Sequence, residues 1–472
     1  MMKYASFLVL ALGILIAVFG CTTSSIYDVD DENFGVINDE AWLYTTQVEP
    51  SGEELTSKSK AWGGINLSLK ETDFFIMYKV AHINSPTLDG NTLQATDVAI
   101  VEDGDLSYAY VTYAMAGDSF YGGTDILQLK RGYFPKLKSR LLTKKEDVNS
   151  VTYDSSTNKL FLGLHVNPGA YDLTGDYHGA YLRSVELNTD KKIKVNAGSL
   201  VTKGVPLHSW AANDAAIMDD EVLVPVGADG GGVEIRSTGD ITDENVANFI
   251  NNLNDTRAVA TYYDSNGNVA GFLVYQGPDD ATPTLYKCDT DGNYIDSLPI
   301  ENPVPETTES KSTIEVHGNV AFVAASDGGV YAIDIDDNMK ILFNIANPDP
   351  GLYGLTDDKV TANDVTVGKL KGSDNESVIF IANGEYGVRA FKLDFDIDSV
   401  NDVASALSGY EPSSHYLGNV HLGTGNSANS VLYRNGYLFV GTGLGGLNVL
   451  YVVDFNFPSL HGKPHWSTPS LR

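Results

Sequence analysis

The sequence predicts an all-β protein, a seven-bladed β-propeller preceded by a signal peptide and a flexible acidic tether. A block of three short apolar strands recurs seven times along the chain. A glycine turn separates the last two strands in most of these copies. Repeats of roughly 50 residues built from short strands are typical of propellers, which have about 4–8 blades.

Residues 1–20 predict an export signal, because the apolar run at 7–19 follows a single cation and is too short to span a membrane. The next motif, VFGC ending at Cys21, resembles a bacterial lipobox. This resemblance implies that Cys21 becomes a diacylated first residue, with palmitate among its acyl chains, and anchors the protein in the outer membrane. The alternative is an ordinary signal peptide with an incidental cysteine. The other cysteine, Cys288, lies in a predicted strand, where a disulfide with Cys21 is not expected.

Small polar and acidic residues dominate 22–60 and predict a solvated tether. An acidic run soon after a lipidated cysteine also resembles the surface-export signal of Bacteroidetes lipoproteins, which implies a cell-surface position. The alternative is a hydrophilic linker. The predicted divisions are a lipoprotein signal peptide at 1–20, the lipidated cysteine and tether at 21–60, the propeller at 61–456 and a C-terminal tail at 457–472.

In the clearest copy of the repeat, residues 313–336, apolar residues alternate with small or polar ones over three strands, separated by turns at 317–319 and 327–329. Both faces of this meander are apolar, so each copy needs neighbours to bury them. The distance between equivalent positions of successive copies runs from 43 to 66 residues, which suits blades with unequal loops and argues against a solenoid. A set of β-sandwiches is the alternative, but it does not explain the recurring polar opening and glycine turn.

Residues 62–82 predict a hairpin that donates the outer strand of the last blade. Such closure ties the two ends of the chain together and removes two open sheet edges. Helix is expected only at 243–253 and 400–407, inside long connections between blades.

The glycine turn followed by VYAIDID at 330–336 resembles the LVIVD repeat of bacterial surface propellers, as do 388–394 and 447–454. The resemblance touches five of the seven copies. It implies a propeller fold and a role as a cell-surface lipoprotein, and it supplies no catalytic residue.

The formal net charge of −31 excludes nucleic acid as a partner, because a phosphate backbone needs clustered Lys and Arg. The charge also disfavours electrostatic binding to anionic head groups, so the lipid is the predicted membrane anchor. Envelope proteins and glycans are the partners that remain.

Each copy opens with polar residues that enter the innermost strand of a blade and so line one mouth of the central channel. Carboxylates and amides at this place suit a cation such as calcium or a sugar, and the one arginine suits a carboxylate ligand. The alternative is structural, because Asp and Asn before a strand commonly bond nearby backbone N–H groups. These opening residues are Asp97, Asn149, Asn213, Asp214, Arg257, Asn363, Asp364 and Asn429.

No metal site is predicted. His165, His178 and His208 come nearest to a cluster, but no two histidines have the close spacing of zinc motifs. The segments that begin at Asp264 and Asp289 start like calcium loops and lack the terminal glutamate, so both predict hairpin turns.

Two function classes follow. The favoured one is a binding or scaffolding module of the cell envelope, with Tyr113, Phe120, Tyr121 and Tyr171 as candidates for exposed aromatic side chains. The alternative is a hydrolase or lyase that acts on a small molecule or glycan at the channel mouth. No sialidase box, quinoprotein repeat, nucleophile elbow or P-loop occurs, so no catalytic residue is assigned and the enzyme class stays open.

Overall fold

The computed structural model describes residues 29–30, 33–56 and 75–454, except 104–105, 116, 118, 131–134, 228–229, 245–247, 252, 278–281, 301–310, 337, 353 and 424. The predicted signal peptide, Cys21 and the predicted tail at 457–472 lie outside these residues. Of the helices in the described part of the chain, none has the length and apolar character needed to cross a membrane.

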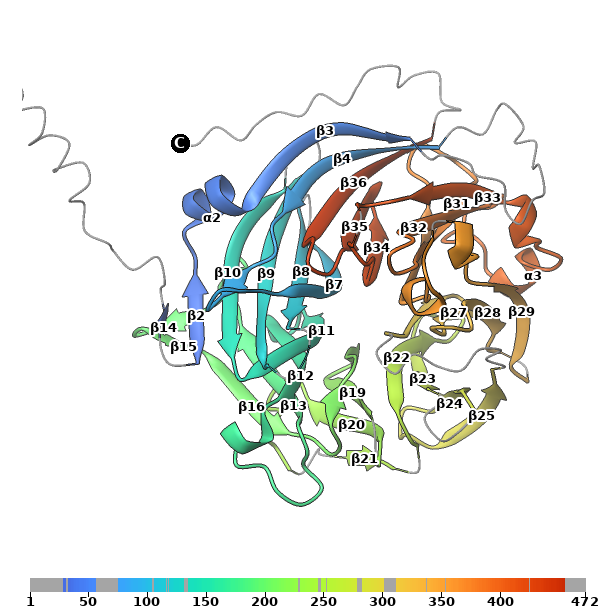
Figure 1. Ribbon diagram of the computed structural model, residues 1–472. Coiled ribbons are helices and arrows are strands. Elements are labelled where there is room, and N and C mark those ends of the chain that lie inside the picture. Colours follow the sequence, from blue (N-terminus) through green and yellow to red (C-terminus); the bar gives the residue numbers. More distant parts are fainter. Residues whose placement is uncertain are drawn as a thin grey trace, which may run out of the picture.

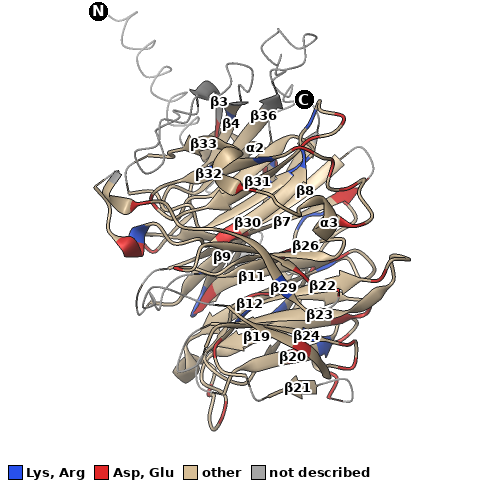
Figure 2. Cartoon of the chain, turned by 90° about the vertical axis from the view of Figure 1, so that its right-hand side faces the viewer, with Lys and Arg blue, Asp and Glu red and all other residues tan. Residues whose placement is uncertain are grey.

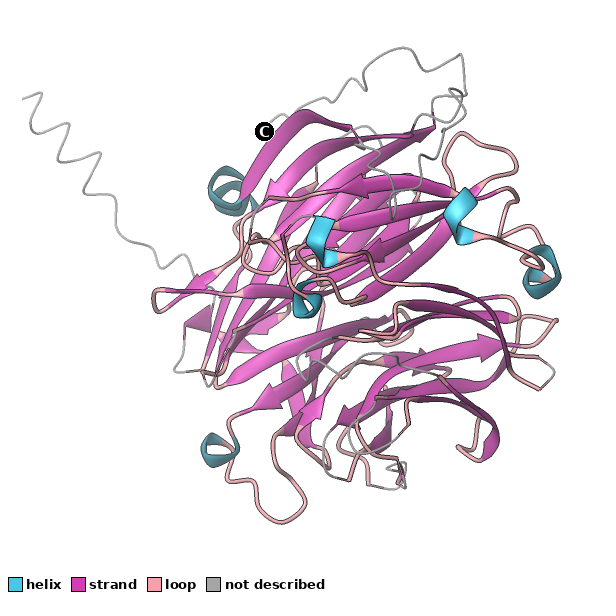
Figure 3. Cartoon of the chain, turned by 45° about the vertical axis from the view of Figure 1, so that its right-hand side comes forward, coloured by secondary structure: helices cyan, strands magenta, loops and turns pink. Residues whose placement is uncertain are grey.

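Seven antiparallel sheets surround a central axis and form a seven-bladed β-propeller, as the sequence predicts (Figure 1). In each blade, three strands follow one another as a meander from the centre outward, and a further strand covers the outer edge. Strands dominate the described chain, and its few helices are short pieces in the connections (Figure 3).

The three inner strands of each blade coincide with the predicted copies of the repeat. They are β7 (Gln94–Asp103), β8 (Leu106–Ala114) and β9 (Tyr121–Lys130) in blade 1; β11 (Glu146–Asp154), β12 (Lys159–Val166) and β13 (Ala180–Glu186) in blade 2; β17 (Ala211–Ala212) with β18 (Ala216–Met218), β19 (Glu221–Gly227) and β20 (Gly232–Ser237) in blade 3; β22 (Thr256–Tyr263), β23 (Val269–Gln276) and β24 (Thr284–Cys288) in blade 4; β26 (Thr313–His317), β27 (Val320–Ala324) and β28 (Val330–Asp334) in blade 5; β30 (Asp364–Lys369), β31 (Ser377–Ala382) and β32 (Val388–Leu393) in blade 6; and β34 (Ser430–Arg434), β35 (Tyr437–Gly441) and β36 (Leu447–Asp454) in blade 7.

The outer strands carry weaker apolar patterns. In blade order they are β10 (Lys136–Lys144), β16 (Thr202–Pro206), β21 (Asn248–Ile250), β25 (Tyr294–Pro299), β29 (Lys340–Ile345), β33 (Tyr416–Val420) and β4 (Phe75–Ile83). The connections hold the two-stranded hairpins β5 (Thr87–Leu88) with β6 (Asn91–Thr92) and β14 (Val195–Asn196) with β15 (Ser199–Leu200), and the 3₁₀ turns η2 (Pro168–Ala170), η3 (Pro350–Leu352), η4 (Asp357–Lys359) and η5 (Pro412–Ser414).

The ring closes as predicted, because β4 from the N-terminal part of the chain pairs with β36 from the C-terminal part. The strand on the other side of β4 is β3 (Val48–Thr56), which the sequence analysis placed in the tether. The first strand of the predicted hairpin lies outside the described residues.

The tether prediction for 21–60 is wrong for residues 34–56, which form two strands and a helix. Strand β2 (Phe34–Ile37) extends blade 1 beside β10, with β1 (Val29–Asp30) beyond it. Helix α2 (Glu40–Gln47) begins at Asp39, whose carboxylate caps it by accepting from the N–H of Trp42. Val36, Ile37 and Leu43 are buried, so enough apolar surface leaves water here to hold a segment that is polar on average.

The helix predictions are half correct. Helix α3 (Val403–Ala406) lies within 400–407, whereas 243–253 contains the outer strand β21. In that segment, pairing with β20 prevails over local helix propensity.

One apolar cluster fills each gap between neighbouring blades, so the described chain contains seven cores arranged in a ring. Both faces of a blade are therefore buried, as in β27, where all five residues are buried. The cluster between blades 7 and 1 contains Tyr113 and Phe439 and closes the ring. Burying these faces is the main favourable contribution to folding and holds the inner strands around the channel.

Candidate functional site

The opening residues lie where the sequence predicts, at the start of the innermost strands. These strands contact one another in sequence around the ring, from β7 through β11, β18, β22, β26 and β30 to β34 and back to β7. The opening residues consequently face one end of the channel, which we call the opening end.

The amide side chains of the opening residues bond the next blade. Asn149 Nδ2 donates to Ala212 O at 3.0 Å, and Asn213 Nδ2 donates to Thr256 O at 2.8 Å. In blades 6 and 7, the equivalent bonds run from Asn363 to Ala428 O at 3.0 Å and from Asn429 to Ala95 O at 3.1 Å. Each amide therefore satisfies a backbone carbonyl at the edge of its neighbour.

The carboxylates of the opening residues form matching bonds with backbone N–H groups. Asp97 Oδ2 accepts from Val151 at 3.1 Å, and Asp214 Oδ2 accepts from Val259 at 3.1 Å. Asp364 Oδ2 accepts from Val431 at 2.8 Å, and its Oδ1 accepts from Thr313 Oγ1 at 2.6 Å. The Asn and Asp side chains thus brace one blade against another, and ligand binding by them stays a prediction.

Arg257 differs from the other opening residues, because its partner lies two residues earlier on the same chain segment. Its Nε donates to Asp255 Oδ2 at 2.6 Å, and both side chains are largely buried. This arginine is already paired with a carboxylate of the protein.

Lys311, which the sequence analysis missed, lies at the centre of the opening residues. It precedes β26 of blade 5, and its Nζ lies 2.6 Å from Asp97 Oδ1 and 3.2 Å from Thr96 O of blade 1. Blades 5 and 1 are not neighbours, so the side chain crosses the channel. No periodicity marks such a contact, and Lys311 ends a polar stretch of sequence that resembles any surface connection.

Three carboxylates and one ammonium group share this poorly solvated place. Burial, and then the charge of Asp97, raise the pKa of Asp214 to about 6. Burial raises the pKa of Asp364 to about 7, although the charge of Lys311 opposes the shift. Burial disfavours the charged form of Lys311, but Asp97, Asp364 and Asp214 outweigh it and raise the pKa of that amine. The ammonium group of Lys311 therefore offsets the negative charge of the three carboxylates.

No group of three or more His, Cys, Asp or Glu side chains in the described part of the chain is placed to bind a metal ion. The two calcium-like segments are closed turns, as predicted. Asp264 Oδ1 accepts from the N–H groups of Asn266 and Asn268, and Asp289 Oδ1 accepts from that of Asn293 at 2.8 Å.

A second cluster lies in the connections and adjoining strands of blades 1 to 3. It is also at the opening end, because β12 ends and β13 begins there. Trp210 stacks on His178 with ring centroids 5.0 Å apart, and Phe249 stacks on His208 with centroids 4.3 Å apart. We call this cluster the aromatic–histidine surface. Its members are Phe120, His165, Tyr177, His178, His208, Trp210 and Phe249.

The three histidines that the sequence analysis singled out all belong to this surface. Each lies against an aromatic ring, with His165 at 4.9 Å from Phe120 in an edge-on geometry. Burial lowers the pKa of His165. Loop contacts between distant residues bring these rings together, so sequence spacing alone does not reveal the pairs.

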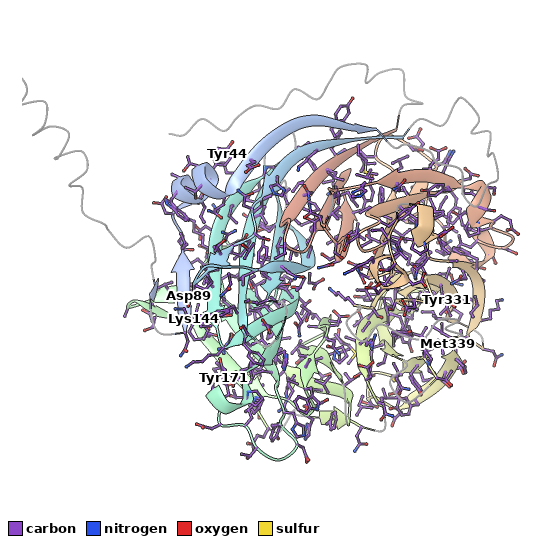
Figure 4. The ribbon with its side chains drawn as sticks, viewed as in Figure 1. Tyr44, Asp89, Lys144, Tyr171, Tyr331 and Met339 are labelled. Carbon is purple, nitrogen blue, oxygen red and sulfur yellow. The ribbon has the colours of Figure 1, made fainter. Side chains whose placement is uncertain are left out.

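Buried charges hold the loops beneath the aromatic–histidine surface. Glu146 accepts from Arg183 and from the hydroxyl of Tyr171, which Figure 4 shows on the loop of blade 2. Glu234 accepts from the ring Nδ1 of His208, from the N–H of the same residue at 3.1 Å, and from Arg236 at 3.0 Å. Charge-assisted hydrogen bonds of this kind are short and strong, and they fix the orientation of the rings above them.

The prediction that Tyr113 is an exposed aromatic residue is wrong. It is fully buried between blades 7 and 1 and donates its hydroxyl proton to Asp125 Oδ2 at 2.9 Å. Phe120 lies in the aromatic–histidine surface, and Phe120, Tyr121 and Tyr171 are all half-buried rather than exposed as predicted. β8 is buried on both faces, and in such a strand the alternation of residue types does not show which side chains are exposed. The sequence therefore does not reveal that Tyr113 is buried.

No protein-family model and no curated protein matches the chain. Solved structures match it in fold. The structure of Sqt1 from Chaetomium thermophilum has 11% identity and a TM-score of 0.50, and the match covers 82% of this chain and 91% of that one. The WD40 β-propeller domain of Doa1 has 14% identity and a TM-score of 0.47, over 82% of this chain and 98% of that one. At such low sequence identities, the likeness to these structures extends to the fold alone.

Proposed function

We propose that this β-propeller is a binding or scaffolding module of a cell-envelope lipoprotein, anchored through Cys21 in the outer membrane and exposed at the cell surface. The export signal, the lipobox-like motif and the acidic segment after it support the anchor. The resemblance of three segments to LVIVD repeats supports the surface location. Asp and Glu residues line many loop edges (Figure 2), which suits a solvated surface protein.

The aromatic–histidine surface is the observation that carries the binding role. Trp210 is 43% exposed, and covering its apolar surface with a partner is favourable. Trp and Tyr are also the side chains that most often dominate binding energies. Buried Glu234 and Glu146 hold the supporting loops, so little conformational entropy is lost when a partner binds.

A photo-crosslinking amino acid tests the binding surface in intact cells. Placed at His178, it should capture one envelope component reproducibly, whereas at Tyr263, an exposed residue at the opposite end of β22, it should not. Equal capture at both positions would remove the case for this surface. The anchor has its own test, because Cys21→Ser should abolish incorporation of an alkyne-labelled palmitate and release the protein from the membrane fraction.

The second candidate is a hydrolase or lyase at the channel mouth, and one observation favours it. Asp214 and Asp364 have pKa values raised to about 6 and about 7, the range of a general acid, and Lys311 lies beside them. Replacing Asp97, Asp214 and Asp364 by Asn should abolish such an activity. A triple variant that folds and retains crosslinking at His178 would support the binding module instead.

A further inference from the structure

We propose that the aromatic–histidine surface binds a neutral saccharide chain; this inference rests on the binding function proposed above. The stacked rings give the surface a flat shape that suits a sugar ring. The imidazole of His178 covers one face of the Trp210 indole at an interplanar angle of 15°, and His208 and Phe249 lie parallel within 1°. Because His178 covers one face of Trp210, the rest of this indole, which is 43% exposed, offers a flat contact of the size of a sugar ring.

The chemistry of the rings favours sugars. Aromatic faces carry negative partial charge, and the C–H groups on one face of a pyranose carry positive partial charge, so the two attract in a stacked geometry. Within the described residues, the large exposed hydrophobic side chains are Trp210, Tyr263, Tyr294, Ile295, Ile341 and Leu444, and only Trp210 belongs to this surface.

Polar groups at the edge of the surface match hydroxyl groups. Asp172 and Asp176 are exposed in the same loop as Tyr177 and His178. Their carboxylates accept hydrogen bonds from sugar hydroxyls but repel carboxylates and sulfates of acidic polysaccharides. The net charge of −31 strengthens that repulsion, so the ligand class is a neutral saccharide.

The backbone under the rings is fixed in place. Ser209 N donates to Asp176 O at 3.1 Å, and Trp210 N donates to Gly227 O at 3.3 Å. Gly179 has φ of +151°, and a Cβ there would lie 2.9 Å from both the His165 ring and Trp210 O. Only glycine permits this close approach, which brings the loop of blade 2 against the connection that carries Trp210.

The test uses the purified full-length chain in detergent and three neutral probes: laminarin, mannan and xylan. At least one should bind in calorimetry, and Trp210→Ala should weaken it about tenfold or more, the loss typical of an anchoring aromatic residue. Trp210→Phe keeps a ring and should recover part of the affinity. Tyr263→Ala, a matched exposed aromatic residue outside the surface, should bind as the wild type does.

Three results would overturn the proposal: no neutral probe binds, Trp210→Ala binds as tightly as the wild type, or the acidic polygalacturonate binds as tightly as the neutral probes. Unchanged thermal unfolding of Trp210→Ala shows that the variant is folded. If no probe binds but crosslinking at His178 captures an envelope protein in cells, the binding module stands and the saccharide inference falls. If both fail, the binding module falls as well.

Discussion

Lys311 of blade 5 and Asp97 of blade 1 form an ion pair across the central channel, with 2.6 Å between Nζ and Oδ1. Their side chains are only 18% and 14% exposed. Removing one partner leaves the other charge unpaired in a poorly solvated place. We expect Lys311→Gln to lower the free energy of unfolding by about 3 kcal/mol, measured by urea denaturation.

A double-mutant cycle isolates this pair. Asp97→Asn removes the carboxylate charge, and in that background Lys311→Gln should cost at least about 1 kcal/mol less than in the wild type. The pair contributes nothing if the two effects simply add. An unchanged urea midpoint for Lys311→Gln would contradict the prediction directly.

The buried carboxyl groups predict how stability depends on pH. The pKa of Asp364 is raised from 3.8 to about 7, so the folded state holds a proton that the unfolded state has lost between about pH 4 and pH 7. This group therefore stabilises the fold at low pH and loses that contribution as pH rises through about 7. Asp364→Asn cannot titrate and should show a smaller fall in melting temperature between pH 5 and pH 8.

The exposed Asp190 provides the control for that measurement. Asp190→Asn removes one carboxylate from the exposed surface and should follow the wild-type pH profile. The prediction is wrong if Asp364→Asn and the wild type lose equal stability over this range.

His317 predicts a pH dependence at higher values. Burial disfavours its charged form, but the hydrogen bonds and charges of Asp398 and Glu315 outweigh this and raise the pKa to about 9. Nε2 lies 2.7 Å from Glu315 Oε1. The stabilisation is complete below pH 6.5 and is lost as pH rises through about 9. The difference in stability between the wild type and His317→Gln should shrink between pH 6 and pH 10.

Nuclear magnetic resonance gives an independent check on His317. Its ring should remain protonated at pH 7.5, and Glu315→Gln should move the titration midpoint downward. A midpoint near the ordinary value of about 6.5 in the wild type would refute the ion pairs as the cause.

The braces between blades predict a graded loss. Asn363→Ala removes the bond from Nδ2 to Ala428 O and should destabilise the protein by about 1–2 kcal/mol. Asn363→Asp places a carboxylate against that carbonyl oxygen and should cost more, as shown by comparing urea midpoints at pH 8. Equal midpoints for the wild type and both variants would mean that water replaces the brace.

The inner strands were predictable because their signals are local. β27 and β28 alternate with a glycine turn between them, and the three inner strands of a blade follow one another within 22 residues in blade 5 and 41 residues in blade 2. The outer strand β25 has mostly exposed or half-exposed side chains, so no apolar pattern marks it. β3, with the sequence VEPSGEELT, becomes a strand only because the edge of β4 is available to pair with it.

The sequence predicted where the candidate site residues lie, but not which residues they bond. Asn149 and Asp214 lie at the channel, as their place near the start of the inner strands implies. Their bonds reach the next blade, and Lys311 reaches Asp97 over 214 residues of chain. Such contacts depend on closure of the ring of blades. The pattern of a single sequence does not show which distant residues closure brings together.

The pairing of β4 with β36 also gives the protein an order of assembly. His82 Nδ1 and Asn448 Oδ1 lie 3.1 Å apart, although 366 residues separate them in sequence. The seventh blade therefore forms only after β36 has emerged, and until then β4 presents an unpaired edge. A chain truncated before Leu447 leaves that edge unpaired and the facing surfaces of two blades exposed. Proteases and chaperones recognise such exposed edges and apolar surfaces in incomplete chains.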